Sequence, residues 1–189
     1  MIIYIHGFGG SGQGSKAKLF REYFKSIEED FISPSLSYVP ELAIATLKEL
    51  IESYHGEVYL IGSSLGGFYA TYLSQMKEVK KVVLLNPAVY PYKTLTRALG
   101  EAPNFYDGSF YSWKQEHIEM LKNYKTDEDL ALAKFMLMVQ KGDELLDYKD
   151  ALQKYEGAKQ IVQEGGNHGF EGIESHFETI REFLGVRDK

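Results

Sequence analysis

Short apolar runs alternate with amphipathic segments along most of this chain of 189 residues. The runs are continuous rather than alternating in polarity, which is typical of strands that are buried on both faces of a parallel sheet. The segments between them place apolar residues at helical spacing and so connect parallel strands. We therefore predict a three-layer α/β fold, with a mostly parallel six-stranded sheet and helices on both faces. The expected strands are residues 1–5, 31–36, 57–61, 82–85, 135–139 and 160–163, and the expected helices are 16–27, 41–54, 65–75, 149–155 and 173–184.

Composition narrows the functional classes. The chain is 44% hydrophobic and 25% charged, which is ordinary for one soluble domain spanning residues 1–189. A net charge of −6 without a basic block argues against a nucleic-acid or anionic-lipid partner. The absence of cysteine excludes disulfides, cysteine nucleophiles and thiolate metal sites. No apolar stretch approaches the ~20 residues of a membrane span, and no signal segment is recognisable, so we expect a cytoplasmic protein.

One interval interrupts the alternation. Residues 88–134 separate two expected strands by more than a simple crossover requires. We expect a cap or lid insertion, largely helical, that shapes the substrate pocket. The alternative is an extra helical layer that packs only on its own aromatic side chains. The interval contains eight aromatic residues, Tyr90, Tyr92, Phe105, Tyr106, Phe110, Tyr111, Trp113 and Tyr124.

A glycine-rich turn follows the expected strand at residues 57–61. It reads Gly62-Ser63-Ser64-Leu65-Gly66-Gly67 and contains the pattern G-x-S-x-G with Ser64 at its centre. Between a strand and a helix, such a turn holds the serine in a strained conformation with its hydroxyl exposed. The flanking glycines are needed because a Cβ there would collide with the turn or the neighbouring strand. The pattern predicts a nucleophilic serine, and a structural turn with a capping serine is the alternative.

A serine nucleophile needs a base, and in strand–turn–helix sites of this kind the acid and then the histidine follow the serine in the chain. His168 lies in Gly165-Gly166-Asn167-His168-Gly169-Phe170, directly after the last expected strand. Glycines on both sides allow an imidazole to be placed freely, so we predict His168 as the general base. The remaining histidines precede the serine, lie in the insertion or lie on the last helix; these are His6, His55, His117 and His176.

The acid is expected after the strand at residues 135–139, and two aspartates follow that strand. Asp143 comes just after a glycine turn, from which a carboxylate can reach the histidine Nδ1–H, and we favour it. Asp147 is the alternative, although its simplest role is to cap the next helix. Glu144 is expected to be solvated or to lie at the rim of the site.

The opening loop, Gly7-Phe8-Gly9-Gly10-Ser11-Gly12, matches the spacing of a dinucleotide-binding loop. That function requires an acidic residue at the end of the second strand, and the chain reads Pro34-Ser35-Leu36-Ser37-Tyr38 there. The order G-K-[ST] of a phosphate loop is missing as well. We instead predict that the loop supplies a backbone N–H to an oxyanion hole, from Phe8 or alternatively Gly9. The second donor is the N–H of Leu65, which follows the serine.

These motifs resemble those of the α/β-hydrolase superfamily and, more closely, of small esterases of the YqiA/YcfP type. The resemblance covers nearly the whole chain and is carried by IYIHGF, IGSSLGGFYATYLSQ, LNPAVYP, GDELLDY and EGGNHGF. It implies an α/β-hydrolase fold that lacks the first two strands of larger members, with the spatial strand order 2-1-3-4-5-6. It also implies hydrolysis of a carboxylic ester by a Ser-Asp-His site.

We therefore expect a serine esterase that uses Ser64, His168 and Asp143, with a small-molecule ester as substrate. No metal or organic cofactor, nucleic acid or membrane is expected to bind, and the chain is expected to be a monomer or a weak homodimer. An acyl-thioesterase and a catalytically silent binding module with a hydrolase fold are the alternatives. The side chains expected to contact the substrate are Phe8, Phe68, Tyr90 and Trp113.

Overall fold

A six-stranded parallel sheet forms the centre of the molecule in the computed structural model, which describes residues 1–126 and 129–186. The strand order is β2-β1-β3-β4-β7-β8, and each neighbouring pair runs parallel. This confirms the predicted fold class and the order implied by the family resemblance. The strands are β1 (Ile2–Ile5), β2 (Phe31–Ile32), β3 (Val58–Ser63), β4 (Val79–Leu85), β7 (Phe135–Gln140) and β8 (Lys159–Gln163).

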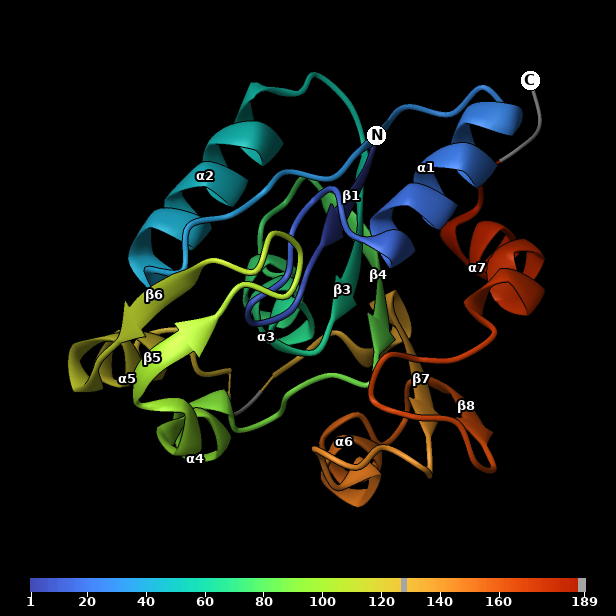
Figure 1. The fold of residues 1–189 in the computed structure, drawn as a ribbon. Coiled ribbons are helices and arrows are strands. Elements are labelled where there is room, and N and C mark those ends of the chain that lie inside the picture. Colours follow the sequence, from blue (N-terminus) through green and yellow to red (C-terminus); the bar gives the residue numbers. More distant parts are fainter. Residues whose placement is uncertain (127–128, 187–189) are drawn as a thin grey trace.

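Helices cover both faces of the sheet (Figure 1). In β1, Ile2 and Tyr4 point into one apolar cluster while Ile3 and Ile5 point into another, so all four side chains are buried. This two-sided burial is the physical reason for the continuous apolar runs. The cluster that contains Ile2 is covered by α1 (Ser15–Ser26) and α7 (Phe177–Leu184). The 3₁₀ turn η3 (Ile173–His176) directly precedes α7. The cluster that contains Ile3 is covered by α2 (Pro40–Ser53), α3 (Leu65–Leu73) and α6 (Tyr148–Lys154).

The second strand is shorter than predicted. The pattern favoured residues 31–36, but β2 pairs with β1 only at Phe31 and Ile32. Pro34 has no N–H to continue the ladder. The serines around it bond to the opening loop instead: Ser33 Oγ donates to the Gly12 carbonyl, and Ser35 Oγ accepts from the Gly12 N–H.

The insertion at residues 88–134 contains strands as well as helices. Its helical elements are α4 (Pro91–Thr94), η1 (Leu95–Ala98), α5 (Gln115–Lys122) and η2 (Leu132–Lys134). Between η1 and α5 lie β5 (Gly100–Pro103) and β6 (Phe110–Trp113), which form a two-stranded antiparallel sheet that the sequence prediction did not include. Residues 127 and 128 of the expected cap lie outside the described part of the chain. Of these elements, α4, α5, β5 and β6 lie together at one side of the molecule (Figure 1).

Within the described ranges, no helix is both long and apolar enough to cross a membrane.

Candidate active site

Ser64 occupies a strained turn between β3 and α3. Its backbone has φ 53° and ψ −120°, a region that non-glycine residues rarely adopt. The turn is held in place because the Ser64 N–H donates to the Leu85 carbonyl at 3.1 Å while its own carbonyl accepts from the N–H groups of Gly67 and Ala88. A Cβ on Gly66 would overlap the carbonyl oxygen of Ile5, so a larger residue cannot stand there. This is the geometry expected of a serine presented at the top of a parallel sheet.

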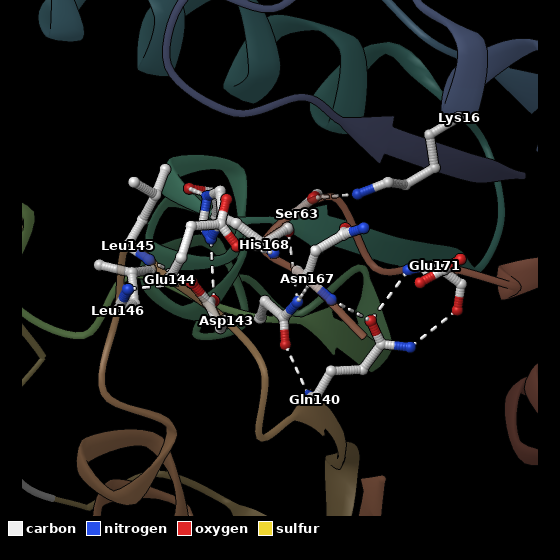
Figure 2. A network of polar contacts seen from close by, with 12 residues as sticks. Lys16, Ser63, Gln140, Asp143, Glu144, Leu145, Leu146, Asn167, His168 and Glu171 are labelled. Atoms are coloured by element: carbon white, nitrogen blue, oxygen red, sulfur yellow. Dashed lines mark hydrogen bonds and ion pairs between the residues drawn. The ribbon is translucent and has the colours of Figure 1, made fainter. Parts of the chain in front are cut away.

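The predicted base and acid lie next to this serine in a continuous chain of hydrogen bonds. His168 Nε2 is 2.9 Å from Ser64 Oγ, and His168 Nδ1 is 2.8 Å from Asp143 Oδ2. The His168 side chain is 18% exposed and that of Asp143 only 2%. With the proton on Nδ1 directed to the carboxylate, Nε2 is free to accept the serine proton. Figure 2 shows Asp143 and His168 side by side.

The other Asp143 oxygen is also occupied. Oδ1 accepts the N–H groups of Leu145 and Leu146, each at 2.9 Å. Burial alone would raise the pKa of Asp143, but the bond from His168 and these two N–H groups outweigh it, so the pKa lies below its ordinary value. Asp147 lies elsewhere, because its side chain accepts the Lys149 N–H and caps α6, as predicted for its simplest role. Of the two candidate acids, the structure brings only Asp143 to the histidine.

Side chains at the ends of β4 and β7 anchor the His168 loop, and the sequence prediction did not include them. Asn86 Nδ2 donates to the carbonyls of Asn167 and His168, at 3.0 and 3.2 Å. Gln140 Oε1 accepts the N–H groups of Asn167 and Glu171, and its Nε2 donates to the Glu171 carbonyl at 2.7 Å (Figure 2). The sequence signal that could have identified Asn86 and Gln140 is their position, because both are polar residues at the ends of strands.

Glu144 has a more specific position than predicted. Instead of being only solvated, its Oε2 accepts the backbone N–H of His168 at 3.0 Å. The side chain therefore helps to fix the loop that carries His168. The bond is at the surface, because Glu144 is exposed.

The opening loop runs close against the serine. A Cβ on Gly7 would lie 3.0 Å from the Ser64 Cβ, so the glycine permits the close approach. Within the described part of the chain, the N–H groups of Phe8 and Leu65 have no hydrogen-bond acceptor. Gly9, the alternative donor, adopts a φ of +66° in this turn, and its carbonyl accepts the Phe105 N–H from the insertion at 2.8 Å.

His6 connects this loop to the segment after β2. Its Nδ1 donates to the Gly7 carbonyl at 2.8 Å, and its Nε2 accepts the Leu36 N–H at 3.0 Å. This pattern requires the neutral ring. Burial agrees with it by lowering the pKa of His6, against the smaller opposing effect of the Gly7 carbonyl.

A cavity of about 430 Å³ opens beside the serine. Of the four side chains expected to contact the substrate, Phe8 lines this cavity, whereas Phe68, Tyr90 and Trp113 do not. Trp113 is only 1% exposed. Its Nε1 donates to the Leu95 carbonyl, and its ring centroid lies 4.9 Å from that of Phe8. On the insertion side, the cavity is instead lined by Thr94, Leu95, Arg97, Ala98, Pro103 and Phe105.

Two other predicted substrate contacts are also placed differently. Phe68 is 4% exposed and belongs to the core under α3, where it packs against Tyr69 and Tyr92. Tyr90 packs against Tyr92, and the Lys93 ammonium lies 4.6 Å from its ring centroid. Both rings stabilise the base of the insertion rather than the cavity wall.

The described residues contain no group of three or more His, Asp or Glu side chains placed to hold a metal ion.

Comparison with known proteins gives a family and a fold. The profile of the Uncharacterised protein family (UPF0227) matches residues 1–185. The UPF0227 protein YcfP of Salmonella paratyphi B is 24% identical over 189 residues, which covers 97% of this chain and 98% of that protein.

Solved structures with similar folds include three α/β proteins at low sequence identity. Mouse alpha/beta hydrolase domain-containing protein 10 has a TM-score of 0.77 at 20% identity, covering 97% of this chain and 89% of that chain. Est1E from Butyrivibrio proteoclasticus with bound ferulic acid has a TM-score of 0.73 at 15% identity, covering 97% of this chain and 87% of that chain. The monoacylglycerol lipase of Paleococcus ferrophilus has a TM-score of 0.70 at 17% identity, covering 97% of this chain and 93% of that chain. These similarities show the α/β-hydrolase fold and confirm that prediction.

Proposed function

This chain belongs to the UPF0227 family, and we propose that it is a serine hydrolase that cleaves a carboxylic ester through an acyl-enzyme. The observation that carries the proposal is the unbroken hydrogen-bonded chain from Ser64 Oγ through His168 to Asp143. A serine hydroxyl is a weak nucleophile until a base removes its proton, and this arrangement supplies both the base and the group that orients it.

In this proposal each group of the site has a role. Ser64 Oγ attacks the ester carbonyl while His168 Nε2 accepts its proton. The unbonded N–H groups of Phe8 and Leu65 are the donors for the oxyanion that forms on the carbonyl oxygen. His168 then protonates the leaving alcohol and afterwards activates the water that releases the acyl group. Asp143 remains a carboxylate throughout and stabilises the imidazolium without taking its proton.

The structural neighbours favour an ester as the substrate class. One protein with a similar fold is named as a monoacylglycerol lipase, and another, Est1E, is named with ferulic acid bound. Those names describe those proteins, and they agree with what the Ser64 site can do chemically. Attack on a thioester would use the same groups, so the test includes both substrate classes.

The proposal is tested with a panel of p-nitrophenyl esters of increasing chain length and matched acyl-thioesters. We expect the wild-type protein to hydrolyse the esters faster than the thioesters. Ser64→Ala should lower kcat by about 10³-fold or more. Ser53→Ala, an exposed serine at the end of α2, is the matched control and should leave kcat unchanged. Folded wild-type protein that hydrolyses neither class, or Ser64→Ala with full activity, would contradict the proposal.

A further inference from the structure

The end of the cavity next to α1 is polar and contains a lysine. Lys16 lies in the first turn of α1, is partly buried and lines the cavity together with Ser63 and Ser64. Its Nζ donates to Ser63 Oγ at 2.8 Å (Figure 2). Because Ser63 directly precedes the nucleophile on β3, the ammonium group is held on the strand that presents Ser64. The other polar side chains that line this end belong to Tyr4, His6, Ser11 and Ser15.

The Lys16 ammonium has more donors than the protein uses. An ammonium group carries three N–H bonds, and within the described ranges Ser63 is its one hydrogen-bond acceptor. Among the described residues, no carboxylate forms an ion pair with Lys16, and the oxygens of Asp143 bond to His168, Leu145 and Leu146 instead. Donors that face a cavity can bond to water or to a ligand, and an anionic ligand makes the stronger, charge-assisted bonds.

Lys16 remains charged at neutral pH in spite of its burial. Burial lowers the pKa of Lys16 to about 8, and the negative charge of Asp143 opposes this change. At pH 7 most of the molecules therefore carry the ammonium form.

The described residues that line the cavity include cations but no carboxylates, although the chain as a whole is negative. Among the described residues that line it there is no aspartate or glutamate, whereas the chain has a net charge of −6. A second cation, Arg97 of η1, lines the insertion side, where it is exposed. The remaining lining on that side is mainly apolar and comprises Leu95, Ala98, Pro103, Phe105, Leu145 and Leu146.

We propose that the ester cleaved at this site carries a carboxylate or a similar anion, which Lys16 binds at the α1 end of the cavity, while the opposite part of the ester is apolar and lies against the insertion. Lys16 is in this view a specificity-determining residue, since it contacts the substrate away from the reacting carbonyl. The inference rests on the proposed esterase function and adds the charge of the substrate to it.

Two matched pairs of esters test the charge preference and locate the anion. In the first pair, 4-nitrophenyl hydrogen adipate carries a carboxylate on the acyl side and 4-nitrophenyl hexanoate does not. In the second pair, 4-carboxyphenyl hexanoate carries it on the alcohol side and 4-carbamoylphenyl hexanoate does not. After subtraction of uncatalysed hydrolysis, we expect the wild-type protein to have the higher kcat/KM for the anionic member of one pair. That pair identifies which side of the ester faces Lys16.

The variant Lys16→Met should lower kcat/KM for that anionic ester by about ten- to a hundred-fold and leave its neutral partner nearly unchanged. The matched control is Lys18→Met, which removes the same charge from an exposed position on α1. A purely structural role for Lys16 would lower both members of the pair alike. That result, or a wild-type preference for the neutral member of both pairs, would overturn the proposal. Failure of the esterase function is distinguishable, because then neither member is hydrolysed.

A second measurement uses only the wild-type protein and so does not depend on how Lys16→Met folds. The ratio of kcat/KM for the anionic ester to that for the neutral one should fall as the pH rises through about 8, because Lys16 loses its charge there. The neighbouring groups do not account for such a change: burial raises the pKa of Tyr4 and lowers that of His6, and the pKa of Asp143 is also low. A constant ratio from pH 7 to 9 would contradict the proposal.

Discussion

At the scale of single residues, Asp143 and Asp147 provide the sharpest comparison, because they are four positions apart and have different partners. Asp143→Asn should lower kcat for ester hydrolysis by about 10³- to 10⁴-fold, because an amide cannot hold the imidazole in the required tautomer. Asp147→Asn should keep both activity and stability, because asparagine is an equally good N-cap. The comparison is made by measuring kcat and the thermal midpoint of both variants. A larger loss of turnover in Asp147→Asn at equal stability would reverse the assignment.

Much of the candidate site is predictable from sequence because its chemistry is confined to strand ends. Ser64, Asp143 and His168 each follow a strand of the parallel sheet, and such ends meet at one edge. Phe68 and Trp113 were expected to contact the substrate, but they lie in the apolar core and not in the cavity wall. An aromatic side chain serves equally well in a core and in a pocket, and only the packing of the insertion decides which.

At the scale of elements, the insertion should separate into a structural part and a substrate-contacting part. Trp113 on β6 is buried and bonded to Leu95, so Trp113→Ala should lower the free energy of unfolding by about 3–5 kcal/mol. Phe105 lines the cavity and is 74% exposed, so Phe105→Ala should change the free energy of unfolding by less than about 0.5 kcal/mol. The Phe105→Ala variant should instead raise KM for long-chain esters, because it removes a ring that lines the cavity. These values are measured by urea unfolding and by steady-state kinetics.

The exposed ring of Phe110 on β6 serves as the control for Phe105. It is 67% exposed and does not line the cavity, so Phe110→Ala should leave both stability and KM unchanged. If Trp113→Ala raised KM without loss of stability, the original prediction of a substrate contact at Trp113 would be reinstated.

The elements themselves were predictable to different degrees. Long periodic segments such as α1 and α2 were found within one residue of their ends, because their buried faces repeat at helical spacing. The pair β5–β6 was missed because its strands have four residues each and are held by pairing with one another rather than by a buried apolar run. In β6 only Trp113 is buried, so the sequence contains little strand signal.

At the scale of the whole molecule, acid should destabilise the fold below about pH 6.5. Burial lowers the pKa of His6, His117 and His176, so the unfolded chain binds more protons than the folded one in this range. Their contribution to the free energy of unfolding is therefore present above pH 6.5 and is lost as the pH falls through the folded pKa values. The lowered pKa of Asp143 acts in the same direction, but only near and below about pH 4.

The variant His176→Gln tests this pH dependence. His176 Nε2 is buried and has no hydrogen-bond partner within the described residues, so protonation would place a charge there without an acceptor. Urea unfolding at pH 7.5 and 5.5 should show a smaller loss of stability in His176→Gln than in the wild type. His55→Gln, at an exposed position, should retain the wild-type loss. An unchanged loss in His176→Gln would show that burial of this ring is not the cause.

The central claim is that Ser64 is a nucleophile activated by His168, and labelling with a fluorophosphonate probe measures this most directly. The probe reacts with an activated serine and needs no knowledge of the substrate. We predict one adduct per folded wild-type chain, located on Ser64 by peptide mass spectrometry, with labelling abolished in Ser64→Ala and strongly slowed in His168→Ala. The exposed-position variant His55→Ala should be labelled at the wild-type rate. Folded wild-type protein that remains unlabelled, or that carries its adduct on another residue, would contradict the claim.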